Sequence, residues 1–216
     1  MNLFIIYFFV VSFQLSNFIY MRLSFFFLAL LVFQSIHSYA QEEKRVFKII
    51  HKGNNIGNLY AKKEQLGDKV IYSNRTEIDT RIITKIEVDY NYKVVYKNEA
   101  LAHAYVLIFF NGKEKTNTYT DQNKEGYNFY EDDELQQKIS EKIKYSTVNL
   151  MFEEPVNINR VYAEEHGNFH QIKKIGPHCY EKINNKGKSS TYTYKDGFLT
   201  QAEIDAGLIN FKIIAN

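Results

Sequence analysis

The chain has 216 residues, with 27 Lys and Arg against 25 Asp and Glu and a formal net charge of +2 at pH 7. This balance gives no electrostatic footprint for nucleic acid or for an anionic membrane surface, so we expect no nucleic-acid partner. With 2 Pro and 10 Gly, the composition excludes a low-complexity or disordered chain. The single cysteine, Cys179, has no partner for an internal disulfide, and we expect it to be buried as a small hydrophobe.

Residues 21–40 predict export. Arg22 supplies a short positive region, Leu23–Phe33 is an apolar run of the right length, and small residues at Ser38 and Ala40 suit a cleavage site. Cleavage after Ala40 would start the mature chain at Gln41. We therefore expect a periplasmic or secreted protein with no stable membrane span after signal cleavage.

Residues 1–20 are apolar but contain no Lys or Arg, so they lack the positive region of a signal. We interpret them as an extension upstream of a true start at Met21. The alternative is a single membrane anchor from Leu3 to Phe33, which Gln14 and Asn17 make less attractive because polar groups without partners are costly in hydrocarbon. Residues 41–216 carry no linker or repeat and are predicted to form a single β-rich domain.

The hydrophobic pattern after residue 40 has a period of two. From Ile86 to Tyr96, apolar and aromatic residues alternate with charged and polar ones, which is typical of an antiparallel strand with one wet face. The run Leu101–Phe110 is apolar on both faces and predicts a central strand, and Asn111-Gly112 after it is a strong hairpin signal. The fold class is mostly all-β: a long antiparallel meander forming a curved sheet, a sandwich or an open barrel.

Two local features qualify this pattern. Asp132–Lys144 begins with acidic residues and repeats an apolar residue every four positions, which favours a short helix near 132–144. The alternative is that Ile139–Tyr145 is a strand. The 17 tyrosines, with no tryptophan, favour half-exposed pleated surfaces on which the hydroxyl groups stay in water.

Several segments resemble a family of secreted proteins known only as a domain of unknown function, number 6134. They are Gly53–Gly57, Tyr96–Leu101, Tyr145–Pro155, Tyr162–Gly167 with Cys179–Glu181, and Thr191–Leu199. Glu99 stands where the family commonly has glycine, so that turn is expected to differ. The resemblance implies a signal-bearing, β-rich exported protein without an assigned activity, and it brings no catalytic residues to this chain.

Histidines and acids between 164 and 179 suggest one possible chemistry. His166, His170 and His178 lie near Glu164 and Glu165 in the sequence, which would suit a metal-dependent enzyme or a hydrolase. If His166 and His170 lay on one strand they would be roughly 13 Å apart and could not share an ion. The alternative is that these histidines and acids lie in solvated turns and bind no metal. The sequence contains no Gly-x-Ser-x-Gly hydrolase elbow and no phosphate-binding loop. We therefore expect no cofactor.

The aromatic face offers the other hypothesis. Tyr90, Tyr92, Tyr96, Tyr105 and Phe109 could line a concave sheet that holds a hydrophobic small molecule or lipid. The alternative is that they only pack one hydrophobic core. The sequence thus favours an exported, non-enzymatic protein that binds an apolar ligand or an envelope protein. A hydrolase or metal-dependent enzyme is the second hypothesis, and a structural module that recruits a partner by strand pairing is the third.

Overall fold

The computed structural model describes residues 41–81, 85–205 and 210–216, so the predicted signal and the upstream extension lie outside the described residues. The first eight strands are β1 (Gln41–His51), β2 (Asn54–Leu66), β3 (Lys69–Arg81), β4 (Lys85–Lys97), β5 (Ala100–Phe110), β6 (Lys113–Asn123), β7 (Gly126–Glu131) and β8 (Glu134–Ile139). A short 3₁₀ helix, η2 (Thr147–Met151), follows. The remaining strands are β9 (Arg160–Ala163), β10 (Asn168–Gly176), β11 (Cys179–Ile183), β12 (Ser189–Lys195), β13 (Phe198–Asp205) and β14 (Asn210–Ala215).

These strands form one antiparallel sheet in the order β8-β7-β6-β5-β4-β3-β2-β1-β14-β13-β12-β11-β10-β9. The order consists of two meanders that are joined where the first strand, β1, pairs with the last, β14. Phe47 pairs with Ala215 and Ile50 with Lys212 at this junction. Within the described part of the chain β8 and β9 end the sheet, which does not close into a barrel. The predicted all-β curved sheet is confirmed.

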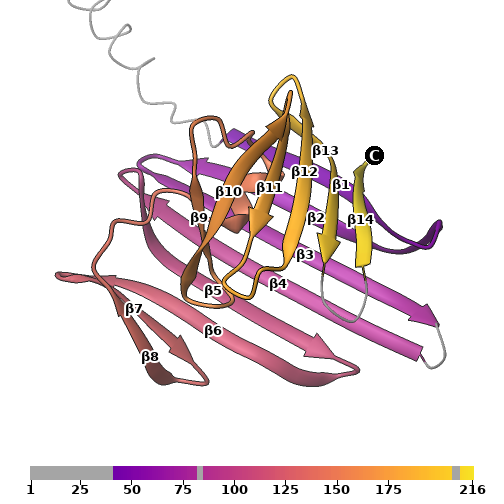
Figure 1. Ribbon diagram of the computed structural model, residues 1–216. Coiled ribbons are helices and arrows are strands. Elements are labelled where there is room, and N and C mark those ends of the chain that lie inside the picture. Colours follow the sequence, from indigo (N-terminus) through magenta and orange to yellow (C-terminus); the bar gives the residue numbers. More distant parts are fainter. Residues whose placement is uncertain (1–40, 82–84, 206–209) are drawn as a thin grey trace, which may run out of the picture. The chain divides into compact units, whose positions relative to one another are not determined.

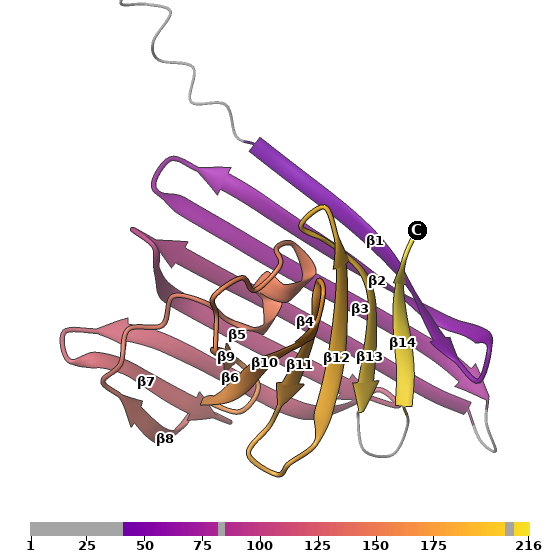
Figure 2. The same cartoon turned by 45° about the horizontal axis from the view of Figure 1, so that its top comes forward.

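The sheet bends sharply at this junction. Figures 1 and 2 show β9–β14 lying across the strands of β1–β6, with η2 enclosed between the two layers. We call β1–β8 the first half of the sheet and β9–β14 the second half. The inner faces of both halves and the buried side of η2 belong to a single hydrophobic core, which includes Phe47, Val94, Leu150, Tyr162 and Ile213.

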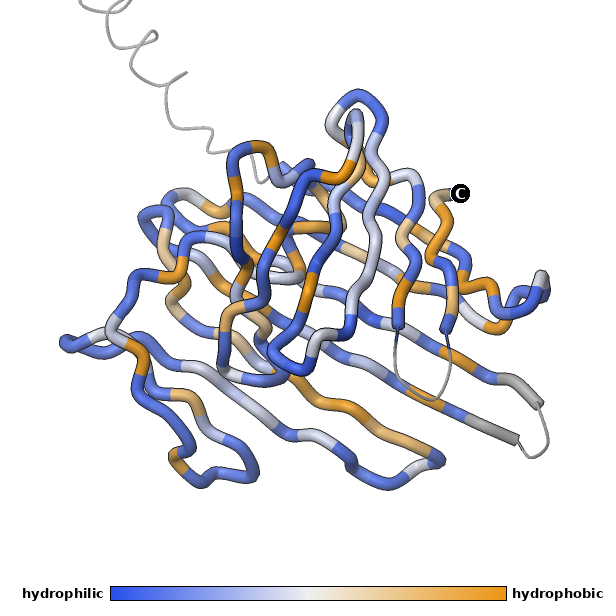
Figure 3. The backbone as a smooth tube through the Cα atoms, viewed as in Figure 1, coloured by the Kyte–Doolittle hydropathy of each residue, from blue (hydrophilic) through white to orange (hydrophobic). Residues whose placement is uncertain are grey.

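Alternation along the strands sets which side chains enter this core. On β4, Val94 and Tyr96 are buried while Lys93 and Lys97 are exposed, as the sequence predicts. The strand β5 ends in a hydrophobic run over residues 106–110 (Figure 3) and lies between β4 and β6. The predicted hairpin at Asn111-Gly112 connects β5 to β6, and both residues have positive φ.

The core is unusually rich in tyrosine, contrary to the expectation of half-exposed rings. Buried tyrosines find internal hydrogen-bond partners: Tyr96 Oη donates to Asn149 Oδ1 (2.9 Å), Tyr194 Oη donates to the Leu150 carbonyl (2.9 Å), and Tyr162 Oη lies 2.8 Å from Thr120 Oγ1. Burial raises the pKa of each of these phenols above its usual value. They therefore stay protonated and act as donors inside the sheet.

The helix predicted near 132–144 is wrong. Asp132 and Asp133 form a tight turn with positive φ, and Glu134–Ile139 is the edge strand β8, paired with β7. The apolar repeat at every fourth residue does not mark one buried helix face, because Leu135 is exposed whereas Ile139 and Ile143 are buried. The Ile143 carbonyl also makes no helical hydrogen bond; it accepts one from the amide of Leu101 on β5 (2.8 Å). The alternative of a strand from Ile139 to Tyr145 is wrong as well.

Two smaller expectations also change. Asn98 and Glu99 both adopt positive φ (49° and 59°) between β4 and β5, so Glu99 occupies a left-handed conformation that glycine adopts more easily. Cys179 is a free thiol but only half-buried, 3.8 Å from Thr193 Oγ1. Across the described segments, no helix combines the length and apolarity needed to cross a membrane.

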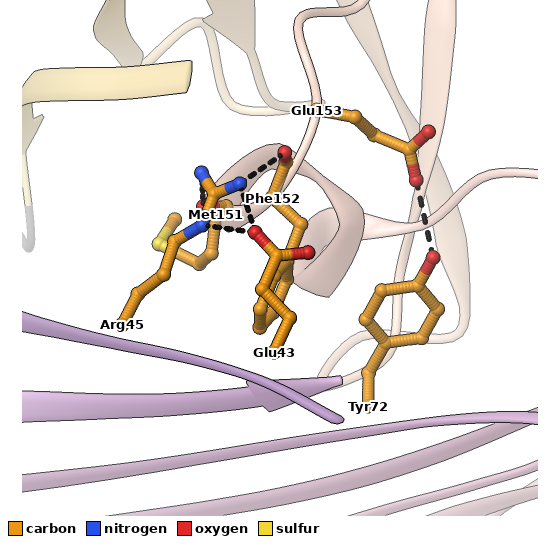
Figure 4. A network of polar contacts seen from close by, with 6 residues as sticks. All are labelled: Glu43, Arg45, Tyr72, Met151, Phe152 and Glu153. Atoms are coloured by element: carbon orange, nitrogen blue, oxygen red, sulfur yellow. Dashed lines mark hydrogen bonds and ion pairs between the residues drawn. The ribbon is translucent and has the colours of Figure 1, made fainter. Parts of the chain in front are cut away.

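The helix η2 is fastened to the first half of the sheet (Figure 4). Arg45 on β1 donates to the carbonyl oxygens of Met151 (3.0 Å) and Phe152 (2.9 Å), and Glu43 accepts from the same guanidinium. Tyr72 on β3 donates to Glu153 Oε1 (3.1 Å). These contacts satisfy carbonyl groups that the end of a helix leaves free and hold η2 against the inner face.

Candidate functional site: a cavity between the two halves of the sheet

A cavity of about 490 Å³ lies between the two halves of the sheet. Its walls come from β1–β4 on one side and from β10–β14 on the other, while η2 and the turn after β9 contribute a third wall. This volume lies within the range of pockets that hold small organic ligands. The lining side chains come from both meanders, so the bend of the sheet creates the cavity.

Part of the cavity lining is apolar. It consists of buried side chains of both halves and of η2: Ile49, Leu59, Met151 and Ile213. The partly buried rings of Tyr90, Tyr92 and Phe211 also line the cavity. Contact with these side chains would remove hydrocarbon from water, which is favourable by about 25 cal/mol per Å² of apolar area.

Three polar side-chain atoms, all in residues that line the cavity, are closed to solvent and have no hydrogen-bond partner in the protein. They are Asn74 Oδ1 on β3, and Asn168 Oδ1 and His170 Nδ1 on β10. The whole side chains of Asn74 and His170 are only 9% and 5% exposed. A buried polar group without a partner costs about 1–3 kcal/mol, so these atoms need explaining.

Burial, with Lys182 and His166 nearby, lowers the pKa of His170 from 6.5 to about 4. The imidazole is therefore neutral near pH 7. A neutral imidazole has one nitrogen that donates and one that accepts a hydrogen bond. His170 thus contributes an uncharged side chain to the cavity lining.

This pKa gives a test of the burial of His170. An unfolded chain binds a proton at His170 below pH 6.5 and the folded chain only below about 4, so stability is complete above 6.5 and is lost as the pH falls through this window. A shift of this size corresponds to roughly 3 kcal/mol of unfolding free energy. We expect His170→Leu to lose less stability than the wild type between pH 7 and pH 4.5 in urea unfolding. Equal losses in both proteins would contradict this account.

Two adjacent glutamates face the cavity in different ways. Glu164 is 1% exposed, and its carboxylate accepts hydrogen bonds from the Thr147 amide (3.2 Å), the Val148 amide (3.1 Å) and the Thr147 hydroxyl. It thus holds the start of η2. Glu165 is half-buried and accepts a hydrogen bond from Tyr92 Oη (3.1 Å).

The predicted aromatic site is divided by the structure. Tyr90 and Tyr92 line the cavity, and Tyr96 lies on the same face but deeper, bonded to Ser146 and Asn149. Tyr105 and Phe109 point to the opposite face, because they pair with Lys93 and Asp89 across the ladder between β4 and β5. The sequence placed all five on one concave face, but the period of two puts the β5 members outside.

Tyr105 instead belongs to a shallow groove on the outer face of the first half. The groove has a volume of about 350 Å³, and Tyr60, Arg75 and Lys93 are among its lining residues. Arg75 is already paired with Glu77 (2.7 Å). This groove is more open than the cavity, and it shares the lining residues Asn74 and Tyr92 with it.

The predicted histidines are also separated. His166 lies in the turn between β9 and β10 and His170 on β10, so both line the cavity, with ring centroids 5.9 Å apart. They approach more closely than two positions on one strand would. His178 lies elsewhere, with Nδ1 3.0 Å from Glu154. Among the described residues, no group of three or more His, Cys, Asp or Glu side chains is arranged to hold a metal ion.

The chain matches one family over residues 47–216, which covers almost every strand described above. That family is described as a domain of unknown function, DUF6134. The chain belongs to the DUF6134 family. No curated protein and no solved structure matches it. The predicted resemblance is confirmed.

Sequence reasoning missed the two asparagines of the cavity. Asn74 follows Val70 and Tyr72 at the inward positions of β3, so a polar residue interrupts an apolar face. That interruption could have marked Asn74 as a candidate site residue. Asn168 gave none, because it directly follows a turn, where asparagine is common.

Proposed function

We propose that this DUF6134 protein is an exported, non-enzymatic binding protein whose cavity holds a small amphipathic molecule. The observation that carries the proposal is one cavity of about 490 Å³ whose lining combines apolar side chains, such as Ile49, Leu59 and Ile213, with polar and charged ones. A molecule with a hydrocarbon part and a polar part would match both kinds of lining. Export rests on the signal-like segment at residues 21–40.

The chain is expressed in full in a bacterial host, recovered without detergent, and analysed by native mass spectrometry before and after organic-solvent extraction. We expect an added mass that extraction removes. Two variants locate it: Thr76→Phe puts a ring into the cavity, and Ser73→Phe puts the same ring on the opposite face of β3, at the outer groove. If the ligand is bound in the cavity, only Thr76→Phe will reduce the added mass.

Loss of the added mass in Ser73→Phe alone would overturn the cavity and assign the ligand to the outer groove. A clean mass both as purified and after incubation with a total lipid extract would overturn small-molecule binding in favour of an envelope-protein partner. Sequencing of the N-terminus tests export separately. We expect a start at Gln41, and an intact residue 1–40 segment on protein retained in the cytoplasm would contradict export.

One observation favours the enzyme hypothesis as a second candidate. His166 and His170 lie together at the cavity, beside Glu165, where a bound ester or amide could reach them. Turnover of a panel of soluble esters would support a hydrolase if His166→Ala abolished it while the melting temperature stayed unchanged. We expect no turnover above background.

A further inference from the structure

Lys182 occupies an inward position of β11. It pairs with Ile172 of β10 on one side and with Ser190 of β12 on the other, and these two side chains are only 5% and 7% exposed. Paired residues on neighbouring strands lie on the same face of a sheet, so Lys182 projects from the inner face of the second half. It is half-buried and lines the cavity. Lysine is rarely withdrawn from water without a partner, so its place in this buried row needs a reason.

Among the residues that the structure describes, no carboxylate lies within ion-pair distance of the Lys182 ammonium group. Its nitrogen, Nζ, lies 5.9 Å from the centre of the Tyr192 ring, which also lines the cavity. In contrast to Asn74 Oδ1 and Asn168 Oδ1, this nitrogen is not closed to solvent, so a bound molecule can reach it. Burial lowers the pKa of nearby His170, and the charge of Lys182 lowers it further. The electrostatic potential at this part of the wall is therefore positive.

Two further lysines of the same hairpin line the cavity. Lys186 and Lys188 are exposed and lie in the turn between β11 and β12. This turn is held by Asn184, whose Oδ1 accepts hydrogen bonds from the Lys186 and Lys188 amides (both 2.9 Å). Within the described segments, neither of these two lysines forms an ion pair with a carboxylate. The lysines of the lining thus place unpaired positive charge on one hairpin.

Among its described residues the lining also contains three carboxylates, but each of them already has a partner. Glu164 accepts hydrogen bonds from two amides and one hydroxyl at the start of η2. Glu165 accepts a hydrogen bond from Tyr92 Oη, and Asp205, at the end of β13, has an interaction of its own. The formal charges of the lining therefore balance, whereas the charge that lacks a partner is positive and lies on the β11–β12 hairpin.

We propose, building on the binding function above, that the bound molecule is an anionic amphipath whose head group pairs with Lys182. An anionic oxygen supplies the countercharge that this ammonium lacks, and hydrogen bonds between charged groups are stronger than neutral ones. The hydrocarbon part of the same molecule packs against the apolar lining, which includes Ile49, Leu59 and Ile213. The two exposed lysines of the turn attract the anion from a longer range. A carboxylate and a phosphate ester share this chemistry.

The test compares four probes that share one hydrocarbon chain length: decanoate, decyl phosphate, monodecanoylglycerol and decylammonium, each titrated calorimetrically below its aggregation concentration at pH 7.5. We expect the better of the two anions to bind about ten-fold or more tighter than the glyceride and the ammonium. That anion also identifies the head group as a carboxylate or a phosphate. Equally tight or tighter binding of the glyceride or the ammonium would overturn the inference and leave cavity binding intact. Binding of none of the four, together with a clean native mass, would overturn the binding function and the inference with it.

Variants assign the contact to Lys182. Lys182→Met removes the charge and nearly keeps the length of the side chain, so we expect affinity for the better anion to fall about ten-fold, between the effects of exposed and of buried ion pairs. Glyceride affinity and the melting temperature are expected to stay near those of the wild type. Lys174→Met is the matched control, because Lys174 Nζ also lies over a tyrosine, 6.0 Å from the centre of the Tyr180 ring, but outside the cavity lining. Unchanged anion affinity in Lys182→Met, an equal loss for the glyceride, or an equal loss in Lys174→Met would overturn the assignment.

Discussion

Replacing Glu164 by alanine is expected to lower the free energy of unfolding by about 3 kcal/mol, the largest effect of any single side chain at the cavity. The carboxylate is buried and accepts three hydrogen bonds from Thr147 and Val148. Hydrogen bonds to charged groups contribute roughly 1.5–3 kcal/mol each, and their loss leaves two amides without partners at the start of η2. Part of the loss is recovered as η2 relaxes.

Urea unfolding followed by circular dichroism measures this change. Glu165→Ala is the matched control, since it removes the neighbouring carboxylate, which is half-buried and accepts a hydrogen bond from Tyr92. We expect the control to lose about 1 kcal/mol. Equal losses in the two variants would mean that Glu164 does not hold η2.

The second large effect is expected from Gly57→Ala. Gly57 lies on β2 opposite Ile78 of β3, and an added methyl group would lie 2.0 Å from the backbone carbonyl oxygen of Glu77. No side-chain rotation relieves a clash with backbone, so the two strands must separate. We expect a loss of roughly 3 kcal/mol, the upper end for overpacking, and a lower melting temperature.

Gly176→Ala provides the comparison for this substitution. The added methyl group there would meet Cys179 Cβ at 3.6 Å, an ordinary contact. We expect its melting temperature to stay close to that of the wild type. A similar loss in both variants would indicate a general cost of removing glycine from strands rather than the close approach of β2 to β3.

Local signals in the sequence predicted much of this fold. The alternation from Ile86 to Tyr96 and the turn at Asn111-Gly112 depend on residues within a few positions of each other, and both are present. The segment 132–144 failed because cross-strand pairing with β7 outweighed a helical repeat, as tertiary context often does.

The site was harder to predict because it depends on the bend of the sheet. Tyr92 and Tyr105 are alike in sequence, yet they face opposite sides of the sheet once the register of β4 and β5 is fixed. A bulge at Val95/Tyr96 shifts that register, and a second one at Ile108/Phe109 shifts the register of β5 and β6; no local sequence pattern indicates either. Nothing near His170 in the sequence indicates that β3 will lie opposite it.

The pairing of β1 with β14 has a consequence for the order of folding. Every other neighbouring pair of strands in the sheet is consecutive along the described chain, so each meander can form from local contacts. The junction joins Phe47 to Ala215 and closes the longest loop in the domain, and contacts at such separation form slowly. The two meanders are thus expected to form early as separate units, and the cavity to come into existence only in the last step, when the final strand docks beside the first.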